Sequence, residues 1–143
     1  MKIALGADHG GFELKEKVKT HLIKNGYEVL DLGTNSTDSV DYPEFGHAVG
    51  HAVVEKKAEF GIVICGTGIG ISIAANKVPG VRAALCTNTT MARLTREHNN
   101  ANILAMGGRI VGDVLALEMV DVFLATEFQG GRHEKRINKI ETI

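Results

Sequence analysis

The sequence predicts an α/β protein in which helices cover both faces of a five-stranded parallel sheet. Five apolar runs of strand length alternate with segments of helical periodicity, and glycine or polar turn residues separate them. Strands that alternate with helices form parallel sheets with both faces covered. This arrangement is a Rossmann-like, three-layer α/β/α sandwich. The 143 residues contain no repeat or linker, so we expect one domain, residues 1–143.

The N-terminal half supplies three of the expected strands. The first apolar run stops at an Asp-His-Gly-Gly turn, and the helix after it carries Phe12, Val18 and Leu22 near one face. An Asn-Gly pair closes that helix. The elements predicted here are a strand over residues 2–7, a helix over 12–25, a strand over 27–32, a polar loop over 33–41, a helix over about 43–56 and a strand over 60–65.

The C-terminal half continues the alternation. Glycines after the third strand lead into an apolar helix, and a Pro-Gly turn precedes the fourth strand. The fifth strand ends at a Gly-Gly-Arg turn, and a second Gly-Gly pair precedes the last helix. The elements predicted here are a helix that ends near residue 76, a strand over 81–86, a helix over 89–98, a strand over 102–106, a helix over 114–125 and a helix over 132–143.

Composition and charge exclude several classes of function. The formal net charge is −1, so no overall field attracts nucleic acid or an anionic membrane. The apolar runs are too short to span a membrane, and the first one is too short for a signal peptide. The two cysteines, Cys65 and Cys86, do not form a disulfide framework in a chain of this size. We therefore expect a cytoplasmic protein that binds neither nucleic acid nor membranes.

The segment Cys65-Gly66-Thr67-Gly68-Ile69-Gly70 is the sharpest chemical signal. Its alternating glycines leave backbone amides unobstructed at a helix N-terminus, which suits a phosphate or a developing oxyanion. No Gly-Lys-Ser/Thr follows, as a P-loop would require, and the segment lacks the last glycine and the acidic residue of a dinucleotide site. The alternative interpretation is a tight turn that needs glycine only for its backbone angles.

Cys65 favours the functional interpretation. A thiol at a strand end that faces a helix N-terminus has its thiolate form favoured by the helix dipole. The alternative is a buried cysteine that acts as a small apolar side chain. Cys86 lacks a glycine loop, and we expect it to be such a buried cysteine.

Other polar residues fall at strand ends and helix ends, where ligands of parallel sheets bind. Asp8-His9 follows the first strand and can hold hydroxyl groups and a phosphate, although Asp8 can also cap a helix. His98 ends a helix and is either an acid-base group or a structural cation. Arg132 and Arg136 share a helix face and either clamp a phosphate or form a solvated basic face.

His47 and His51 are spaced four residues apart, as metal ligands on a helix often are. The helical wheel places both on the side opposite the apolar residues, and no third ligand accompanies them. We therefore expect no metal site.

Several segments together resemble the ribose-5-phosphate isomerase B family, which also includes galactose-6-phosphate isomerase subunits. The likeness covers nearly the whole chain and is most specific in the glycine loop. The segments that carry it are Gly6 to Gly11, Asp41-Tyr42-Pro43, Ile64 to Lys77, Arg96 to Asn99, Gly108-Arg109 and Gly130 to His133. The resemblance implies strand order 2-1-3-5-4, a homodimer or homotetramer with a shared active site, and a C-terminal helix at the dimer interface.

The resemblance also implies a reaction and a set of roles. The reaction is the interconversion of D-ribose 5-phosphate and D-ribulose 5-phosphate through a cis-enediolate, without metal or cofactor. Cys65 would be the base and His98 the ring-opening acid, while Thr67 and Asp8 would assist proton movement. The residues implied to bind the substrate are Asp8, His9, Tyr42, Gly66, Thr67, Gly68, Ile69, Gly70, Asn99, Arg109, Arg132 and Arg136. We expect His98, Asn99 and Arg109 to come from the partner subunit.

Three other functions remain open at this point. The same chemistry on a six-carbon sugar phosphate, such as allose 6-phosphate or galactose 6-phosphate, is the nearest. A non-catalytic nucleotide- or phosphate-binding module would use the glycine loop without turnover. A redox sensor would use Cys65, although no resolving cysteine lies near it in sequence.

Overall fold

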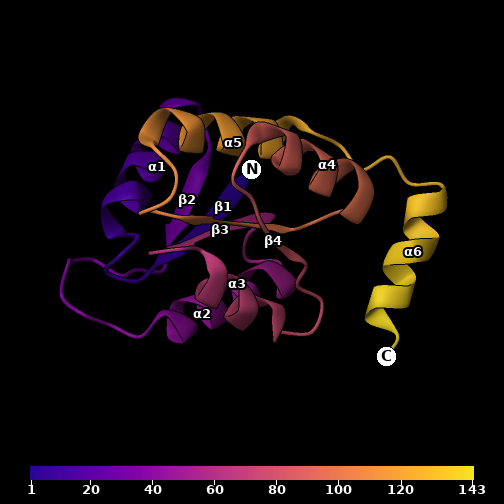
Figure 1. Ribbon diagram of the computed structural model, residues 1–143, viewed down its shortest axis with the longest axis horizontal. Helices are drawn as coiled ribbons and strands as arrows, with labels where there is room; N and C mark the ends of the chain where they lie inside the picture. The colour runs from indigo at the N-terminus through magenta and orange to yellow at the C-terminus, as the bar shows by residue number, and fades with distance from the viewer.

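The computed structural model describes residues 1–143 and confirms the predicted fold class. All five strands are parallel in one sheet of order β2-β1-β3-β5-β4, the order that the resemblance implied (Figure 1). The strands are β1 (Lys2–Ala7), β2 (Glu28–Asp31), β3 (Phe60–Cys65), β4 (Ala83–Leu85) and β5 (Ile103–Gly107). The helices are α1 (Phe12–Lys24), α2 (Tyr42–Val54), α3 (Ile69–Asn76), α4 (Thr89–Asn99), α5 (Asp113–Ala125) and α6 (Arg132–Glu141).

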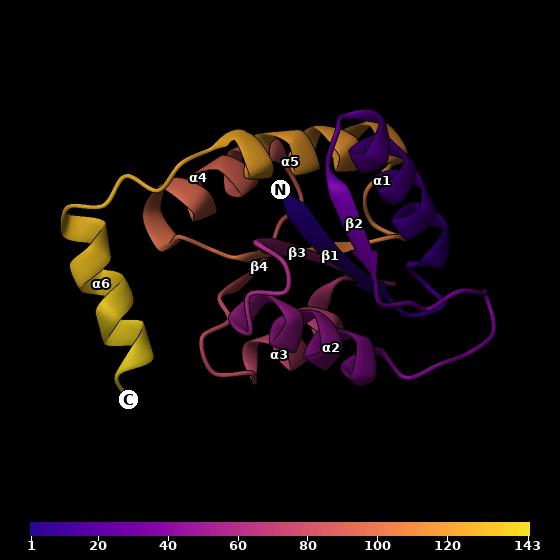
Figure 2. The ribbon, with the colours of Figure 1, turned by 180° about the vertical axis from the view of Figure 1, so that it is seen from behind.

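The sheet separates two hydrophobic cores. Helices α1, α4 and α5 cover one face, and α2 and α3 cover the other (Figures 1 and 2). Side chains of the central strand β3 alternate between them. Ile62 and Ile64 enter the α1–α4–α5 core, whereas Val63 and Cys65 enter the α2–α3 core. Because successive side chains of a strand point to opposite faces, this period of two places the Cys65 sulfur on the α2–α3 side.

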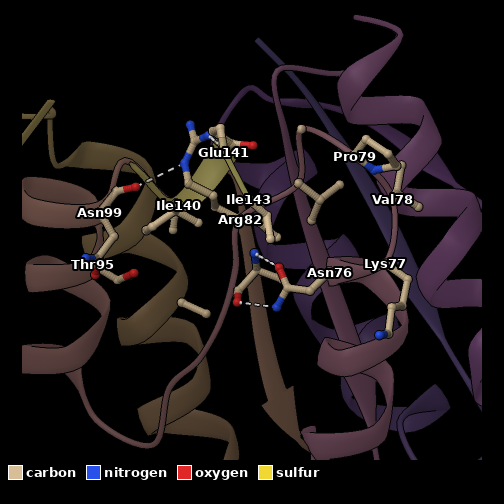
Figure 3. A pocket seen from close by; sticks show the side chains of 15 residues that line it. Asn76, Lys77, Val78, Pro79, Arg82, Thr95, Asn99, Ile140, Glu141 and Ile143 are labelled. Atoms are coloured by element: carbon tan, nitrogen blue, oxygen red, sulfur yellow. Dashed lines mark hydrogen bonds and ion pairs between the residues drawn. The ribbon is translucent and has the colours of Figure 1, made fainter. Parts of the chain in front are cut away.

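The edge strand β4 is shorter than predicted. It covers three residues, because the two residues before it bond elsewhere: Val81 N–H donates to the Val78 carbonyl, and Arg82 N–H donates to the side chain of Asn102. On its outer edge the Asn76 side chain takes the place of a neighbouring strand. It accepts from Ala83 N–H at 2.8 Å and donates to the Ala83 carbonyl at 3.0 Å (Figure 3). Covering an edge in this way blocks pairing with other chains.

The last helix stands away from the rest of the molecule (Figure 2). In α6 only His133 and Ile137 are buried, and they pack toward α4. A cleft of about 710 Å³ separates the helix from the end of α3 and the start of β4. Arg82 bridges this cleft by donating to the Asn99 carbonyl at 3.1 Å and to Glu141 at 2.6 Å (Figure 3). None of the helices is long and apolar enough to cross a membrane.

Two buried cations link helices to neighbouring elements. The fully buried Lys15 ammonium donates to both oxygens of Asp31, at 2.7 and 2.8 Å, and so ties α1 to β2. The buried Arg96 guanidinium donates to the Ala101 carbonyl at 2.7 Å and to the Thr126 carbonyl at 3.1 Å. Those carbonyls follow the C-termini of α4 and α5, where helix dipoles favour positive charge. Arg96 therefore holds the ends of the two helices together.

Candidate active site

Three loops meet at the carboxyl edge of the sheet, after β1, β3 and β5. Glycine makes this approach possible, because a methyl group on Gly108 would lie 2.6 Å from the Gly10 carbonyl oxygen. Hydrogen bonds fasten the loop after β5 to the loop after β3. Gly108 N–H donates to the Cys65 carbonyl at 2.8 Å, and Arg109 N–H donates to the Gly66 carbonyl at 3.0 Å. The sheet thus assembles the segments that the sequence analysis singled out.

The Cys65 sulfur lies at the centre of this edge. It accepts a hydrogen bond from Gly68 N–H at 3.1 Å, and this contact stabilises negative charge on the sulfur. Cys65 is only 4% exposed, and neither of the two main clefts reaches it. Cys86 differs, because burial raises the pKa of its thiol to about 11. Cys86 is therefore the inert, buried cysteine that the sequence predicted.

The glycine loop offers fewer free amides than the sequence implied. The amide of Gly68 is used by the sulfur, and Ile69 N–H donates to Thr67 Oγ1 at 3.2 Å. The amides of Gly66, Thr67 and Gly70 have no hydrogen-bond partner within the chain. Backbone amides left open at a helix N-terminus form an anion site. The three open amides, rather than all five, are the candidates for contact with a ligand.

Asp8 and His9 contribute fixed polar groups from the loop after β1. Asp8 is buried, and its Oδ1 accepts from the amides of Gly10 and Gly11 at 2.9 and 3.2 Å. Asp8 therefore orders the turn before α1 and does not cap the helix, whose N-cap is Gly11 without a side-chain cap, and its Oδ2 remains for another partner. His9 Nδ1 accepts from Val40 N–H at 3.2 Å. A neutral His9 must then carry its hydrogen on Nε2, which makes that nitrogen a donor.

Tyr42 and Arg109 border the loop on two sides. A methyl group on Gly70 would lie 2.6 Å from Cε1 of Tyr42, so the ring rests directly against the loop. A methyl group on Gly66 would lie 3.1 Å from Nη1 of the exposed Arg109. Within one chain Arg109 already lies against this loop, which favours the same subunit over the partner subunit as its source. The hydrogen bond between Arg109 and Gly66 explains the placement.

The remaining predicted site residues form a second group at the opposite edge of the sheet. Helix α4 runs back from the end of β4 to the start of β5, so its last residues, His98 and Asn99, lie at the amino edge (Figure 1). Arg132 and Arg136 are exposed on α6 beside them. We call His98, Asn99, Arg132 and Arg136 the α4–α6 cluster. One chain alone cannot bring this cluster to Cys65.

His133 is a member of this region that the sequence analysis did not single out as a site residue. Its ring stacks on His98, with ring centroids 4.4 Å apart and planes 14° from parallel. Its Nε2 is shielded from solvent and has no hydrogen-bond partner. Burial lowers the pKa of His133, and His98, Arg132 and Arg136 lower it further, while Glu97 opposes them. The available signal was weak: His133 and Ile137, four residues apart, interrupt a helix of mostly charged residues.

His47 and His51 are exposed on α2, as the helical wheel predicted. No group of three or more His, Cys, Asp or Glu side chains is arranged to hold a metal ion.

The fold and the site define an α/β protein whose carboxyl edge presents open amides beside a thiol, an arrangement suited to an anionic ligand. A model of the ribose/galactose isomerase family matches residues 3–140. The ribose-5-phosphate isomerase B of Escherichia coli is 48% identical over 142 residues, which cover 99% of this chain and 95% of the relative.

Solved structures agree in fold. The ribose-5-phosphate isomerase B of Clostridium thermocellum is 61% identical and superposes with a TM-score of 0.98, covering 99% of this chain and 95% of that one. The enzyme of Mycoplasma genitalium, solved with bound ribulose 5-phosphate, is 44% identical with a TM-score of 0.94, covering 98% and 93%. The chain belongs to the ribose/galactose isomerase family.

Proposed function

We propose that this protein is an aldose–ketose isomerase that interconverts D-ribose 5-phosphate and D-ribulose 5-phosphate. The similarity to ribose-5-phosphate isomerases B over nearly the whole chain supports the substrate, and so does the relative that holds ribulose 5-phosphate. The observation that carries the proposal is the hydrogen bond from Gly68 N–H to Cys65 Sγ, because it holds a nucleophilic sulfur next to three open amides.

Isomerisation requires a base near C1 and C2 and a stabiliser for the cis-enediolate. Cys65 acts as the base that takes the proton from one carbon and returns it to the other. The open amides of Gly66, Thr67 and Gly70 donate to the developing oxyanion, and each well-placed donor contributes about 3 kcal/mol. Asp8, with Oδ2 still available, binds the sugar hydroxyls and moves a proton between O1 and O2. The Thr67 hydroxyl supports the reacting oxygens.

The phosphate end of the substrate is contacted by residues around the glycine loop. His9 can donate through Nε2, and Arg109 and the Tyr42 ring lie against the glycine loop. A guanidinium and an imidazole donor suit a phosphate group. The proposed site uses a reduced thiol and needs no metal or organic cofactor, which fits a cytoplasmic enzyme.

A second subunit completes the proposed site. His98, Asn99, Arg132 and Arg136 of the partner subunit would face Cys65, His98 as the acid that opens the furanose ring. The separation of the α4–α6 cluster from Cys65 within one chain supports this arrangement. Apolar side chains on the elements involved are more than half exposed in the single chain, among them Ile69 and Ile73 of α3 and Ile140 of α6. A homodimer, or a tetramer of two such dimers, would bury them, with α6 at the interface.

The test of the base compares the two cysteines. Cys65→Ala should abolish isomerisation of ribose 5-phosphate and also the exchange of the C1 hydrogen of ribulose 5-phosphate with D₂O, followed by NMR. Cys86→Ala is the matched control and should keep both activities, because its thiol is inert and lies in the other core. Normal exchange by the Cys65→Ala protein would contradict the assignment.

A second comparison tests ring opening. Ribulose 5-phosphate has its O5 blocked by phosphate and stays open, so its C1 exchange does not need a ring-opening acid. His98→Asn should therefore lower the turnover of ribose 5-phosphate much more than C1 exchange. Equal losses in the two assays would show that His98 acts elsewhere.

The six-carbon alternative deserves a direct comparison, because the matched family includes galactose isomerases. We expect kcat/KM to be higher for ribose 5-phosphate than for allose 6-phosphate or galactose 6-phosphate. A higher value for a six-carbon sugar would keep the mechanism and replace the substrate.

A further inference from the structure

The stacked pair of His98 and His133 joins two elements that otherwise share little contact. His98 lies in the last turn of α4, and His133 lies at the start of α6. The rings are nearly parallel at 4.4 Å between centroids, and His133 and Ile137 are the only buried residues of α6. His98 is half-buried, so one side of its ring is covered by His133 while the residue keeps access to solvent.

His133 is too enclosed to contact a substrate through Nε2. That atom is shielded from solvent, and the residue is only 6% exposed. Nε2 also has no hydrogen-bond partner in the chain. A buried polar atom without a partner carries a free-energy cost. Nε2 therefore contributes nothing favourable to stability, and what His133 offers His98 is the flat face of its ring.

The surroundings keep His133 uncharged. Burial and the neighbouring charges of His98, Arg132 and Arg136 lower its pKa, and only Glu97 opposes them. The Glu97 carboxylate is itself engaged by Arg93 at 3.1 Å and by the Gln129 amide at 3.2 Å. A proton on His133 would therefore be buried among cations without an acceptor.

We propose that His133 is a positioning residue whose uncharged ring holds His98 in the plane required to transfer a proton to the sugar. A neutral aromatic face accepts a cation stacked on it. The partner ring can consequently gain and lose its proton without meeting a second charge. This inference rests on the proposed function of His98 as the ring-opening acid.

The experiment compares His133→Phe with His133→Ala, and adds Ile137→Ala as a control that loosens α6 without touching the stack. The Phe side chain keeps a flat, neutral ring, so the turnover of ribose 5-phosphate should stay within about twofold of the parent. The Ala variant removes the ring and should lose on the order of 10- to 100-fold in kcat, the cost of a misplaced catalytic group. Ile137→Ala should raise KM more than it lowers kcat, because α6 also carries Arg132 and Arg136.

Two further measurements separate the possible failures. C1 exchange of ribulose 5-phosphate should be unchanged in the Phe and Ala variants. If the parent protein itself showed no C1 exchange, the proposed function would be refuted rather than the role of His133. NMR titration of ring-labelled parent protein should show that His133 stays neutral through the pH range of activity, a readout that does not depend on the Ala variant folding. A His133 ring that titrates within that range, a Phe variant as impaired as Ala, or a harmless Ala variant would each overturn the inference.

Discussion

Gly68 is the position where a single added methyl group should lower the stability of the fold most. Its φ is 80°, in the left-handed region, and an L-residue there costs about 1–2 kcal/mol. A methyl group would also lie 2.7 Å from the Met106 carbonyl carbon and 2.9 Å from Gly107 N, which are backbone atoms that cannot turn aside. Overpacking of this kind costs about 1–3 kcal/mol. Gly68→Ala should therefore lower the free energy of unfolding by about 2–5 kcal/mol.

Two other glycines distinguish the cost of a left-handed backbone conformation from the cost of a steric clash. Gly26 has a φ of 88° but nothing within 4 Å of the added methyl, so Gly26→Ala should cost only the conformational term of about 1–2 kcal/mol. Gly112 has a negative φ and equally open surroundings, so Gly112→Ala should change stability by less than about 1 kcal/mol. The three variants form a graded series in which only Gly68 meets both penalties.

Urea unfolding followed by circular dichroism measures the series, provided that the slope m is the same in all variants. Isomerase activity is a second readout, because Gly68 N–H also holds the Cys65 sulfur. If Gly68→Ala were no less stable than Gly26→Ala, the close packing of this loop against β5 would be refuted. A variant with full activity would contradict the importance of the bond between the amide and the sulfur.

Three other predictions concern acid stability, the buried lysine of α1 and metals. Burial opposes ionisation of Asp31, but hydrogen bonds from Lys15, Gly33 and Lys19 outweigh it and lower the pKa of Asp31. The resulting stability is complete above the unfolded-state pKa near 3.8 and is lost as the pH falls through the lower folded-state value. Urea midpoints between pH 7 and pH 3 should therefore fall less for Asp31→Asn than for the parent, and a parallel decline would be contrary to this account. Lys15→Met should cost roughly 3 kcal/mol at neutral pH, because it leaves the partly buried carboxylate of Asp31 with Lys19 as its remaining lysine partner; a loss below about 1 kcal/mol would show that Lys19 suffices. Activity should be unaffected by EDTA. A loss that a divalent metal restores would instead indicate a metal site, with the exposed histidines of α2 as its candidate ligands.

Local patterns predicted most of the fold because they report local preferences. The apolar run of β3 and the alternating glycines after it mark a buried strand and a turn whatever surrounds them. Strand ends were less predictable where hydrogen bonds come from elsewhere. Residues 81 and 82 were expected in β4, but Arg82 N–H is bonded to the side chain of Asn102, twenty positions away. Nothing in the sequence near Arg82 reports that partner.

The candidate site was predicted unevenly for the same reason. Cys65 was identified because its glycine loop is contiguous in sequence. Three features of the site were not predicted: the hydrogen bond from the Ile69 amide to Thr67, the position of Arg109 beside Gly66, and the stack of His133 on His98. Each depends on how separate segments or side chains are oriented, and residue type alone does not indicate that orientation.

By itself the sequence determined the order of strands and helices, the parallel sheet, and the chemical identity of the thiol and the glycine loop beside it. These follow from hydrophobic period, turn residues and reactivity, all of which are properties of neighbouring residues. Only the tertiary structure decided which amides remain open, how far the sulfur is enclosed, and that His98 lies across the sheet from Cys65. The reason is physical: a helix that returns antiparallel to its strand carries its last residues to the far edge, and only the packed chain reveals which groups then meet.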